Sequence, residues 1–135
     1  MLQLTYISTA TGTMSDVDVS TILSVSRLNN AAAGVTGLLL YDGRRFLQAL
    51  EGEAAMVDRT FQRIKADKRH RAVVLLSSGE ATERSFGNWA MAAERASAGH
   101  RGNNVAELVD TLTETVADPN VRALFRSFAR VRDAA

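Results

Sequence analysis

The sequence predicts an α+β fold: a ferredoxin-like βαββαββ sandwich with two appended C-terminal helices. Strand-like and helix-like segments alternate over the first 95 residues, and two amphipathic helical stripes follow them. The 135 residues, 46% hydrophobic and 23% charged, suit one globular domain with a buried core. We therefore divide the chain into a core at residues 1–95 and a helical cap or output segment at residues 96–135.

The first strand and the first helix follow from periodicity. Alternate residues from Leu2 to Ser8 share one face, which predicts a strand. Ser15 and Asp18 have the spacing of a capping box, so a helix is expected to start there. One stripe of this helix begins apolar and ends polar. Its members, at offsets 0, 3, 4, 7 and 11, are Val19, Ile22, Leu23, Ser26 and Asn30.

A hairpin comes next along the chain. Residues 36–41 and 45–51 have strand patterns, and the connecting Asp42-Gly43-Arg44 places a glycine in the turn. In a split βαβ topology we expect the first and third strands to be parallel neighbours. Tyr6 and Gln48 interrupt the apolar faces of these strands, so we expect the two side chains to lie side by side in the middle of the sheet.

The rest of the chain predicts a second helix, two strands and two final helices. The helix is expected from Glu53 to Lys65. Residues 72–77 are mostly apolar, which predicts a buried strand, and residues 89–93 supply a fifth strand. A helical stripe over residues 105–116 precedes a last helix that opens at Asp118-Pro119. These two helices are expected to cover the free face of the sheet or another subunit.

Composition excludes several classes of function. The absence of cysteine rules out disulfides, thiolate catalysis and cysteine-ligated metals. A formal net charge of +1 provides no general basic field for nucleic acid or an anionic membrane. The N-terminus lacks a signal-peptide pattern and no apolar run reaches membrane-spanning length. We therefore expect a cytoplasmic protein with neither nucleic acid nor a membrane as partner.

Catalytic and metal-binding motifs are also missing. The sequence has no Walker-type phosphate loop, Gly-x-Gly-x-x-Gly, Gly-x-Ser-x-Gly or His-Glu-x-x-His. His70 ends a charged segment that starts at Asp67 and is typical of a solvated helix end. Glu51 and Glu53 flank a turn and are expected to be solvated. We therefore expect no catalytic residue, no metal site and no enzyme.

Four polar residues stand on or beside otherwise apolar faces: Tyr6, Gln48, Asn30 and Arg63. Each has an ordinary explanation. Tyr6 suits an amphipathic core position, and Gln48 suits an amide bonded to neighbouring backbone. Asn30 suits a C-terminal cap, and Arg63 suits a surface side chain with a buried stem. Together, however, they direct polar groups to one sheet face between two helices, and this set suits a flat, polar-edged heterocycle.

Several short motifs recur in a fixed order over nearly all of the first 92 residues. The most specific is Phe46 to Gly52, with the pattern Phe-x-Gln-x-Leu-Glu-Gly. The others are Tyr6-Ile7-Ser8, Asn29-Asn30, Gly34 to Leu39, Tyr41-Asp42-Gly43, Phe61, Arg63-Ile64, Asp67, Arg69-His70, Arg84, Phe86 and Trp89-Ala90-Met91. In this combination the chain resembles the BLUF family, sensors of blue light using FAD.

The resemblance implies a photoactive pair. Tyr6 would give an electron and then a proton to the excited flavin. Gln48 would bridge the tyrosine hydroxyl and the N5/C4-carbonyl edge of the flavin. Its rearranged amide would then hydrogen-bond the C4 carbonyl and shift the absorption to the red, by rotation or by tautomerisation.

The resemblance also implies a cofactor, its contacts and a route for the signal. The cofactor is FAD, with FMN or riboflavin as alternatives because no sequence feature marks an adenine pocket. Trp89 and Met91 would relay the change at Gln48 to the C-terminal helices, which would act on self-association (a homo-oligomer) or on an unknown downstream protein. The implied flavin contacts are Asn30, Asn29, Ser26, Arg63 and His70.

Two other functions stay open. A small ferredoxin-like hydrolase requires an arginine–asparagine pair around an anion-binding loop, and the sequence shows no such loop. A ligand-binding or scaffolding module without photochemistry would keep the same fold. The absorption spectrum separates the three, since a hydrolase is expected to be colourless and a scaffold colourless or photochemically inert.

Overall fold

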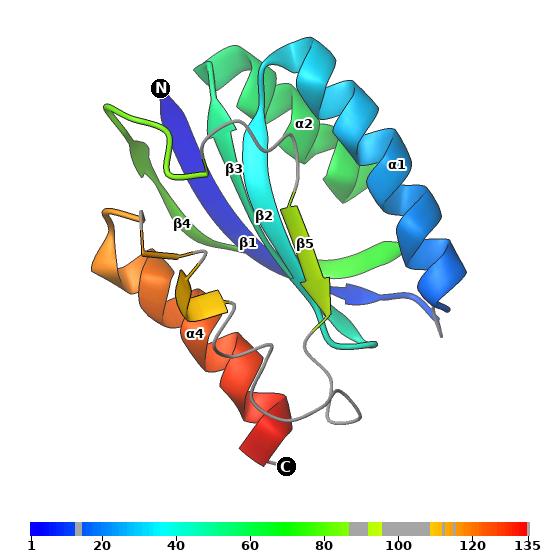
Figure 1. Cartoon of the computed structure of the whole chain (residues 1–135). Coiled ribbons are helices and arrows are strands. Elements are labelled where there is room, and N and C mark those ends of the chain that lie inside the picture. The colour runs from blue at the N-terminus through cyan, green and yellow to red at the C-terminus, as the bar shows by residue number, and fades with distance from the viewer. Residues whose placement is uncertain (13–14, 87–91, 96–108, 112, 115, 135) are drawn as a thin grey trace.

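The computed structural model describes residues 1–12, 15–86, 92–95, 109–111, 113–114 and 116–134. A five-stranded sheet forms the middle layer, with two helices on one face and the C-terminal helix on the other (Figure 1). This arrangement confirms the expected ferredoxin-like class. The elements are β1 Leu2–Ala10, α1 Asp16–Ala33, β2 Thr36–Tyr41, β3 Arg45–Gly52, α2 Ala54–Ala66, β4 His70–Glu80, β5 Ala92–Arg95 and α4 Pro119–Ala134.

The strands follow the order β4-β1-β3-β2-β5. Among the strands that the structure describes, β2 and β5 pair in parallel and the other neighbours pair antiparallel. The prediction that β1 and β3 run parallel was wrong, because Tyr6 and Gln48 face each other in an antiparallel register. The crossover through α1 makes β1 parallel to β2 with a gap between them. The hairpin then folds β3 back into that gap, antiparallel to both neighbours. The pair nevertheless lies in the middle of the sheet, as expected.

Capping residues fix both ends of α1. The Ser15 hydroxyl accepts a hydrogen bond from the Asp18 N–H at 3.1 Å, and the Asp18 carboxylate accepts one from the Ser15 N–H at 3.0 Å. This confirms the predicted capping box. At the other end Gly34 has a left-handed φ of 69°, and the Val35 N–H donates to the Asn30 carbonyl at 2.8 Å. Asn30 is therefore held in the last turn of α1.

The outer strand β4 differs from its prediction. Residues 72–77 were expected to be buried, but Val74, Leu75 and Leu76 are 50%, 48% and 40% exposed. Within the part of the chain that the structure describes, β4 pairs on one side only, with β1. An edge strand therefore explains the exposure that the apolar run did not predict. Of the fifth strand expected at residues 89–93, the first three residues lie outside the described ones, and β5 is seen at Ala92–Arg95.

Each face of the sheet carries its own apolar cluster. One joins the sheet to α1 and α2, and its buried members include Val19, Leu39 and Val57. The other joins the sheet to α4, through Val121 and Phe125 among others. Of the two expected alternatives, cover of the free sheet face or of another subunit, α4 bears out the first. Of the helix expected over residues 105–116, residues 109–111 are helical and 113–114 form a turn, while the other described residue, 116, is in neither.

Candidate functional site

The candidate site begins with Tyr6 and Gln48, on adjacent strands. Both side chains are buried, and the Tyr6 hydroxyl donates a hydrogen bond to the Gln48 Oε1. Residues directly opposite in an antiparallel pair point to the same face, so the register itself brings the phenol to the amide. The contact therefore follows from the hairpin and the crossover rather than from any loop.

Tyr6 is held as a neutral phenol. Its ring packs against Phe61 with the centroids 5.4 Å apart. Burial raises the pKa of the Tyr6 phenol far above its ordinary value, and the negative charge of Asp67 raises it further. Tyr6 consequently keeps its proton at neutral pH and acts as a hydrogen-bond donor.

A cavity of about 90 Å³ lies between α1, α2 and the sheet, with Gln48 in its wall. Its apolar lining includes Ile22 from α1, Leu39 from β2 and Ile64 from α2. All five of the flavin contacts implied by the resemblance line it as well. These are Ser26, Asn29, Asn30, Arg63 and His70.

The end of α1 supplies three of these polar groups. Ser26, Asn29 and Asn30 occupy one face of its last turns, because residues three and four apart lie together on a helix. Asn30 is only 2% exposed, whereas Asn29 is exposed and Ser26 is half-buried. Asn30 is thus the buried amide on this wall, and Gln48 is its counterpart on the sheet.

His70 borders the cavity at the start of β4. Its Nδ1 lies 2.8 Å from the Ser8 hydroxyl, and its ring packs on Phe46 with the centroids 4.9 Å apart. Burial lowers the pKa of His70, and the positive charge of Arg69 also lowers it, although Asp67 acts in the opposite direction. The imidazole is therefore held close to its neutral form.

Asp67 and Arg69 line the same cavity, so the interpretation of this segment as a solvated helix end was incomplete. The guanidinium of Arg69 pairs with the Asp67 carboxylate at 2.6 Å. The hydrogen bond from Arg69 lowers the pKa of Asp67 to about 2. The cavity is consequently bordered by a carboxylate that already has a cationic partner.

The sequence reasoning missed two further residues of this region. Thr60 is buried, lines the cavity and donates its hydroxyl to the Met56 carbonyl at 2.9 Å. Its three-residue spacing from Arg63 was the available signal. Ser8, the partner of His70, shares the face of Tyr6 by simple alternation. The predicted relay residues, Trp89 and Met91, lie outside the described residues.

The chemistry of this cavity fits the edge of a flavin ring. Gln48 and Asn30 each present an amide with donors and an acceptor, and Arg63 adds donors. The enclosed volume of about 90 Å³ is smaller than the roughly 300–1,000 Å³ of typical ligand pockets. The cavity as it stands therefore has room for the edge of a ring and not for a whole three-ring ligand. Among the described residues no cluster of three acidic, histidine or cysteine side chains suits a metal ion.

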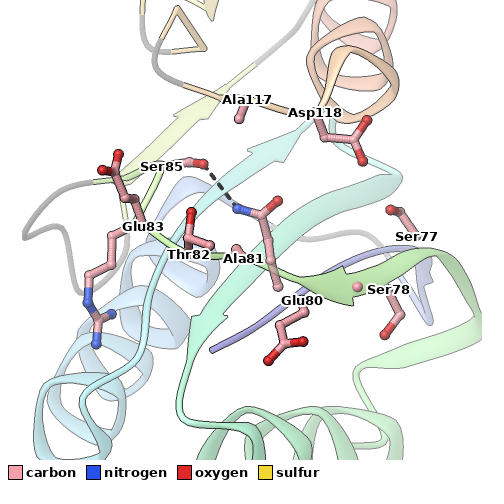
Figure 2. Close-up of a pocket in the computed structure, with 12 residues that line it drawn as sticks. Ser77, Ser78, Glu80, Ala81, Thr82, Glu83, Ser85, Ala117 and Asp118 are labelled. Carbon is pink, nitrogen blue, oxygen red and sulfur yellow. Dashed lines mark hydrogen bonds between the residues drawn. The ribbon is translucent and has the colours of Figure 1, made fainter.

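A larger cavity of about 300 Å³ lies elsewhere, between the end of β4, the connection after it and the start of α4 (Figure 2). Its lining is mostly polar and includes Ser77, Thr82 and Asp118. The described residues around it include no aromatic side chain that would stack on a ring. None of the residues predicted for the flavin site lines it.

Comparison with known sequences identifies related proteins. A family model described as sensors of blue-light using FAD, BLUF, matches residues 1–92. Photoactivated adenylate cyclase subunit alpha of Euglena gracilis is 36% identical over 88 residues, which are 65% of this chain and 9% of that protein. The subunit beta of Euglena longa is 39% identical over 83 residues, 62% of this chain and 10% of that protein. The chain thus spans about a tenth of these relatives.

Solved structures show the same arrangement over nearly the whole chain. The dark-state structure of BlrB, a BLUF protein, has a TM-score of 0.72 and 30% identity, and the match covers 96% of both chains. The photo-activated state of BlsA has a TM-score of 0.71 and 27% identity, covering 95% of this chain and 93% of that one. Klebsiella pneumoniae BlrP1 has a TM-score of 0.81 and 28% identity, covering 97% of this chain and 33% of that one. No helix in the described ranges is long and apolar enough to cross a membrane.

Proposed function

Because the chain belongs to the BLUF family, the sensors of blue light using FAD, we propose that Tyr6 and Gln48 carry its light response and that protein contacts carry its signal. The observation that supports this assignment of roles is the hydrogen bond from the Tyr6 hydroxyl to Gln48, since Gln48 also lines the cavity between α1 and α2. One amide thus stands between a buried phenol and the cavity that the edge of the ring would enter.

The chemistry starts from the dark arrangement of the two side chains. A bound flavin supplies the absorption of blue light and an excited state that accepts an electron. Tyr6 holds its proton in the dark, because burial raises the pKa of the phenol. When Tyr6 loses an electron, its phenol becomes strongly acidic and the proton moves along the hydrogen bond toward the Gln48 Oε1.

The side chain of Gln48 is suited to keep a changed hydrogen-bond arrangement after the proton transfer. Its amide carries an acceptor oxygen and a donor nitrogen, so rotation or tautomerisation exchanges what it offers to a ligand and to Tyr6. Return of the electron and the proton restores Tyr6, while the rearranged Gln48 stays in place until it relaxes. The lit state then differs from the dark state in hydrogen bonds rather than in covalent composition.

Five residues are assigned to hold the ring. Asn30 is the principal contact, because its amide is buried in the cavity wall. Asn29, Ser26, Arg63 and His70 contribute from the rim. The description of the family supports FAD as the proposed cofactor, and the mass of the flavin released from purified protein distinguishes it from FMN and riboflavin.

We assign residues 1–95 to the sensor and residues 96–135 to a helical output segment. Adenylate cyclase activity belongs to the relatives in whose names it appears, of which this chain spans about a tenth. The signal is proposed to leave through self-association or through a separate protein, with Trp89 and Met91 as predicted relay residues.

The absorption spectrum before, during and after blue illumination tests this function. We expect a flavin band that shifts to the red without bleaching and recovers in darkness. A flavin that only bleaches would indicate a binding module without the photocycle. A protein that stays colourless after reconstitution with FAD would overturn the proposal and favour the hydrolase or scaffold alternatives.

A further inference from the structure

Glu51 is a fully buried carboxylate that the proposed light response does not use. Successive side chains of β3 point to opposite faces, so Leu47, Ala49 and Glu51 face α4 while Gln48 faces the flavin cavity. The expectation that Glu51 is solvated was therefore wrong. A buried carboxylate is costly unless hydrogen-bond donors surround it. The groups that donate to Glu51 therefore show which parts of the chain this residue holds together.

Four donors surround the Glu51 carboxylate. Gln3 on β1 and Thr36 on β2 are its cross-strand neighbours, and they donate to it at 3.4 and 3.1 Å. The backbone N–H groups of Ser85 and Phe86 donate to its two oxygens at 2.7 and 3.2 Å. The Ser85 hydroxyl also accepts a hydrogen bond from Gln3 at 3.1 Å, drawn as the dashed line in Figure 2. Glu51 thus fastens the connection that follows β4 to the end of β3.

Arg84 fastens the same connection to the end of α1. Its guanidinium donates to the Gly34 carbonyl at 2.8 Å and to the Thr36 hydroxyl at 2.9 Å. Gly34 is the cap of α1, four residues beyond Asn30. At Gly52 an added Cβ would lie 2.9 Å from the Gly34 carbonyl oxygen, so the ends of β3 and α1 are in close contact. The ends of α1 and β3, the elements that carry Asn30 and Gln48, therefore meet at this connection.

The next side chain, Phe86, reaches the C-terminal helix. Its ring is 1% exposed and meets the ring of Phe125 on α4, with the centroids 6.4 Å apart and the planes at 60°. Both rings belong to the apolar cluster between the sheet and α4. Packed interiors transmit small displacements, so a shift of the Phe86 backbone moves a ring against which α4 packs.

We propose that Glu51 is a positioning residue that couples the flavin-site strand β3 to α4 through Phe86. A rearrangement of Gln48 shifts the end of β3, the Glu51 carboxylate moves the amides of Ser85 and Phe86, and the Phe86 ring moves Phe125. This inference rests on the proposed light response. The route runs through described residues and does not depend on Trp89 or Met91.

The test uses flavin-loaded full chain in wild-type form and as Glu51→Gln and Phe86→Leu. Glu51→Gln replaces an acceptor oxygen by an NH2 group, which cannot accept hydrogen bonds from the surrounding donors. Phe86→Leu removes the ring but keeps the backbone N–H that donates to Glu51. Both variants are expected to keep the red shift of the flavin band, because the changed side chains lie on the opposite face from Gln48. Both are expected to lose most of the light-induced change in amide exchange of α4.

Phe128→Leu is the matched control. Phe128 is a buried phenylalanine on α4, the helix that also carries Phe125. Its ring lies 5.2 Å from the Arg45 guanidinium at the β2–β3 hairpin. This variant is expected to keep both the red shift and the light response of α4. A purely structural role of Glu51 would change exchange equally in dark and lit protein and would leave the light-minus-dark difference at α4.

The outcomes separate the two proposals. A wild type with no red shift would overturn the proposed function, and the coupling with it. A wild type with a red shift but no response of α4, or a response that survives in both variants, would overturn the coupling alone. If Glu51→Gln does not fold, Phe86→Leu decides, because it leaves the side chain of Glu51 and its donors in place.

Discussion

The two faces of the sheet treat their buried polar groups in opposite ways. Under α1 and α2, Gln48 and Asn30 line a cavity. Under α4, the Glu51 carboxylate is surrounded by donors from the chain itself. The amides of the first face thus border a cavity that a ligand can enter, whereas the carboxylate of the second is enclosed by groups of the chain.

One strand, β3, connects these two environments. Gln48 and Glu51 are three residues apart, and the alternation of side chains sends them to opposite faces. The difference shows that the role of a polar residue in a strand cannot be inferred until the face of the sheet to which it points is known. It also makes separable predictions: changes on the cavity face should alter the light response, and changes on the α4 face should alter stability and output.

The largest expected effect is the loss of the light response. Tyr6→Phe removes the hydroxyl that donates to Gln48, and Gln48→Leu removes the amide that receives it. Each variant is expected to bind flavin and to lose the red shift entirely, as measured by the difference spectrum after blue illumination. Either variant with a wild-type shift would contradict the assigned roles.

Asn29→Ala is the control for this pair. Its side chain is exposed at the rim of the same cavity, so its loss should weaken flavin binding slightly and leave the shift in place.

The effect of Tyr6→Phe on stability should be small. It should cost only about 1 kcal/mol of unfolding free energy, the ordinary net value of one hydrogen bond.

The next effect is on stability and belongs to the α4 face. Glu51→Ala leaves the buried N–H groups of Ser85 and Phe86 without their acceptor, each worth roughly 1–3 kcal/mol when unsatisfied. We expect unfolding free energy to fall by about 3 kcal/mol or more, measured by urea denaturation. Glu53→Ala, an exposed acid two residues away, should change it by less than about 0.5 kcal/mol. Equal losses in the two variants would contradict the buried role of Glu51.

Glu51 also shows where prediction from the sequence stops. Local patterns predicted the start of α1 at Ser15 and put Gln48 and Tyr6 each on a strand face, because capping and alternation depend on neighbours in the chain. That the two side chains lie side by side came from the assumed topology, which had the right neighbours and the wrong direction. The same alternation did not predict that Glu51, an acidic residue beside a turn, is buried. The donors that make burial possible come from Ser85 and Phe86, 34 and 35 residues away. Only the tertiary fold brings them together.

The other two errors have the same origin. The run from Ala72 to Ser77 is equally compatible with a central strand and an edge strand, and only the strand order distinguishes them. The direction of β3 relative to β1 depends on how the hairpin enters the gap left by α1, and no residue pattern within either strand encodes it. The polar residues that interrupt otherwise apolar faces were easier to find in the sequence, and the structure brings Gln48, Asn30 and Arg63 to one cavity.

A third prediction concerns the ligand itself. If flavin binds in the cavity between α1, α2 and the sheet, binding should stabilise the folded chain by about 2.7 kcal/mol at a free flavin concentration of 100 times the Kd. The gain should appear as a higher melting temperature and as slower amide exchange in α1 and α2, with a smaller change in α4. If flavin slowed amide exchange in α4 as much as in α1 and α2, ligand binding would stabilise both faces of the sheet equally. Asn30→Ala should reduce the gain, because it removes a buried amide from the cavity wall.

The smallest expected effect is a dependence of stability on pH in the flavin-free protein. Burial lowers the pKa of His70 in the folded state, while the unfolded chain should titrate near the ordinary value of about 6.5. Just below that value the unfolded state binds more protons than the folded one, so unfolding free energy should fall as the pH is lowered through this window.

Asp67 acts in a separate window. Its pKa of about 2 lies below the ordinary value of 3.8, so its stabilising contribution is present above that ordinary value and is lost as the pH falls toward 2. His70→Asn retains a side chain that can bond Ser8 but does not titrate. Urea denaturation at a series of pH values should therefore show a flatter slope below about pH 6.5 in this variant. Most of the acid loss below about pH 4 should remain, because the hydrogen bond from Arg69 lowers the pKa of Asp67 more than the charge of His70 does. An unchanged slope in the upper window would mean that His70 is as easily protonated in the folded protein as in the unfolded one, contrary to its burial between Phe46 and Ser8.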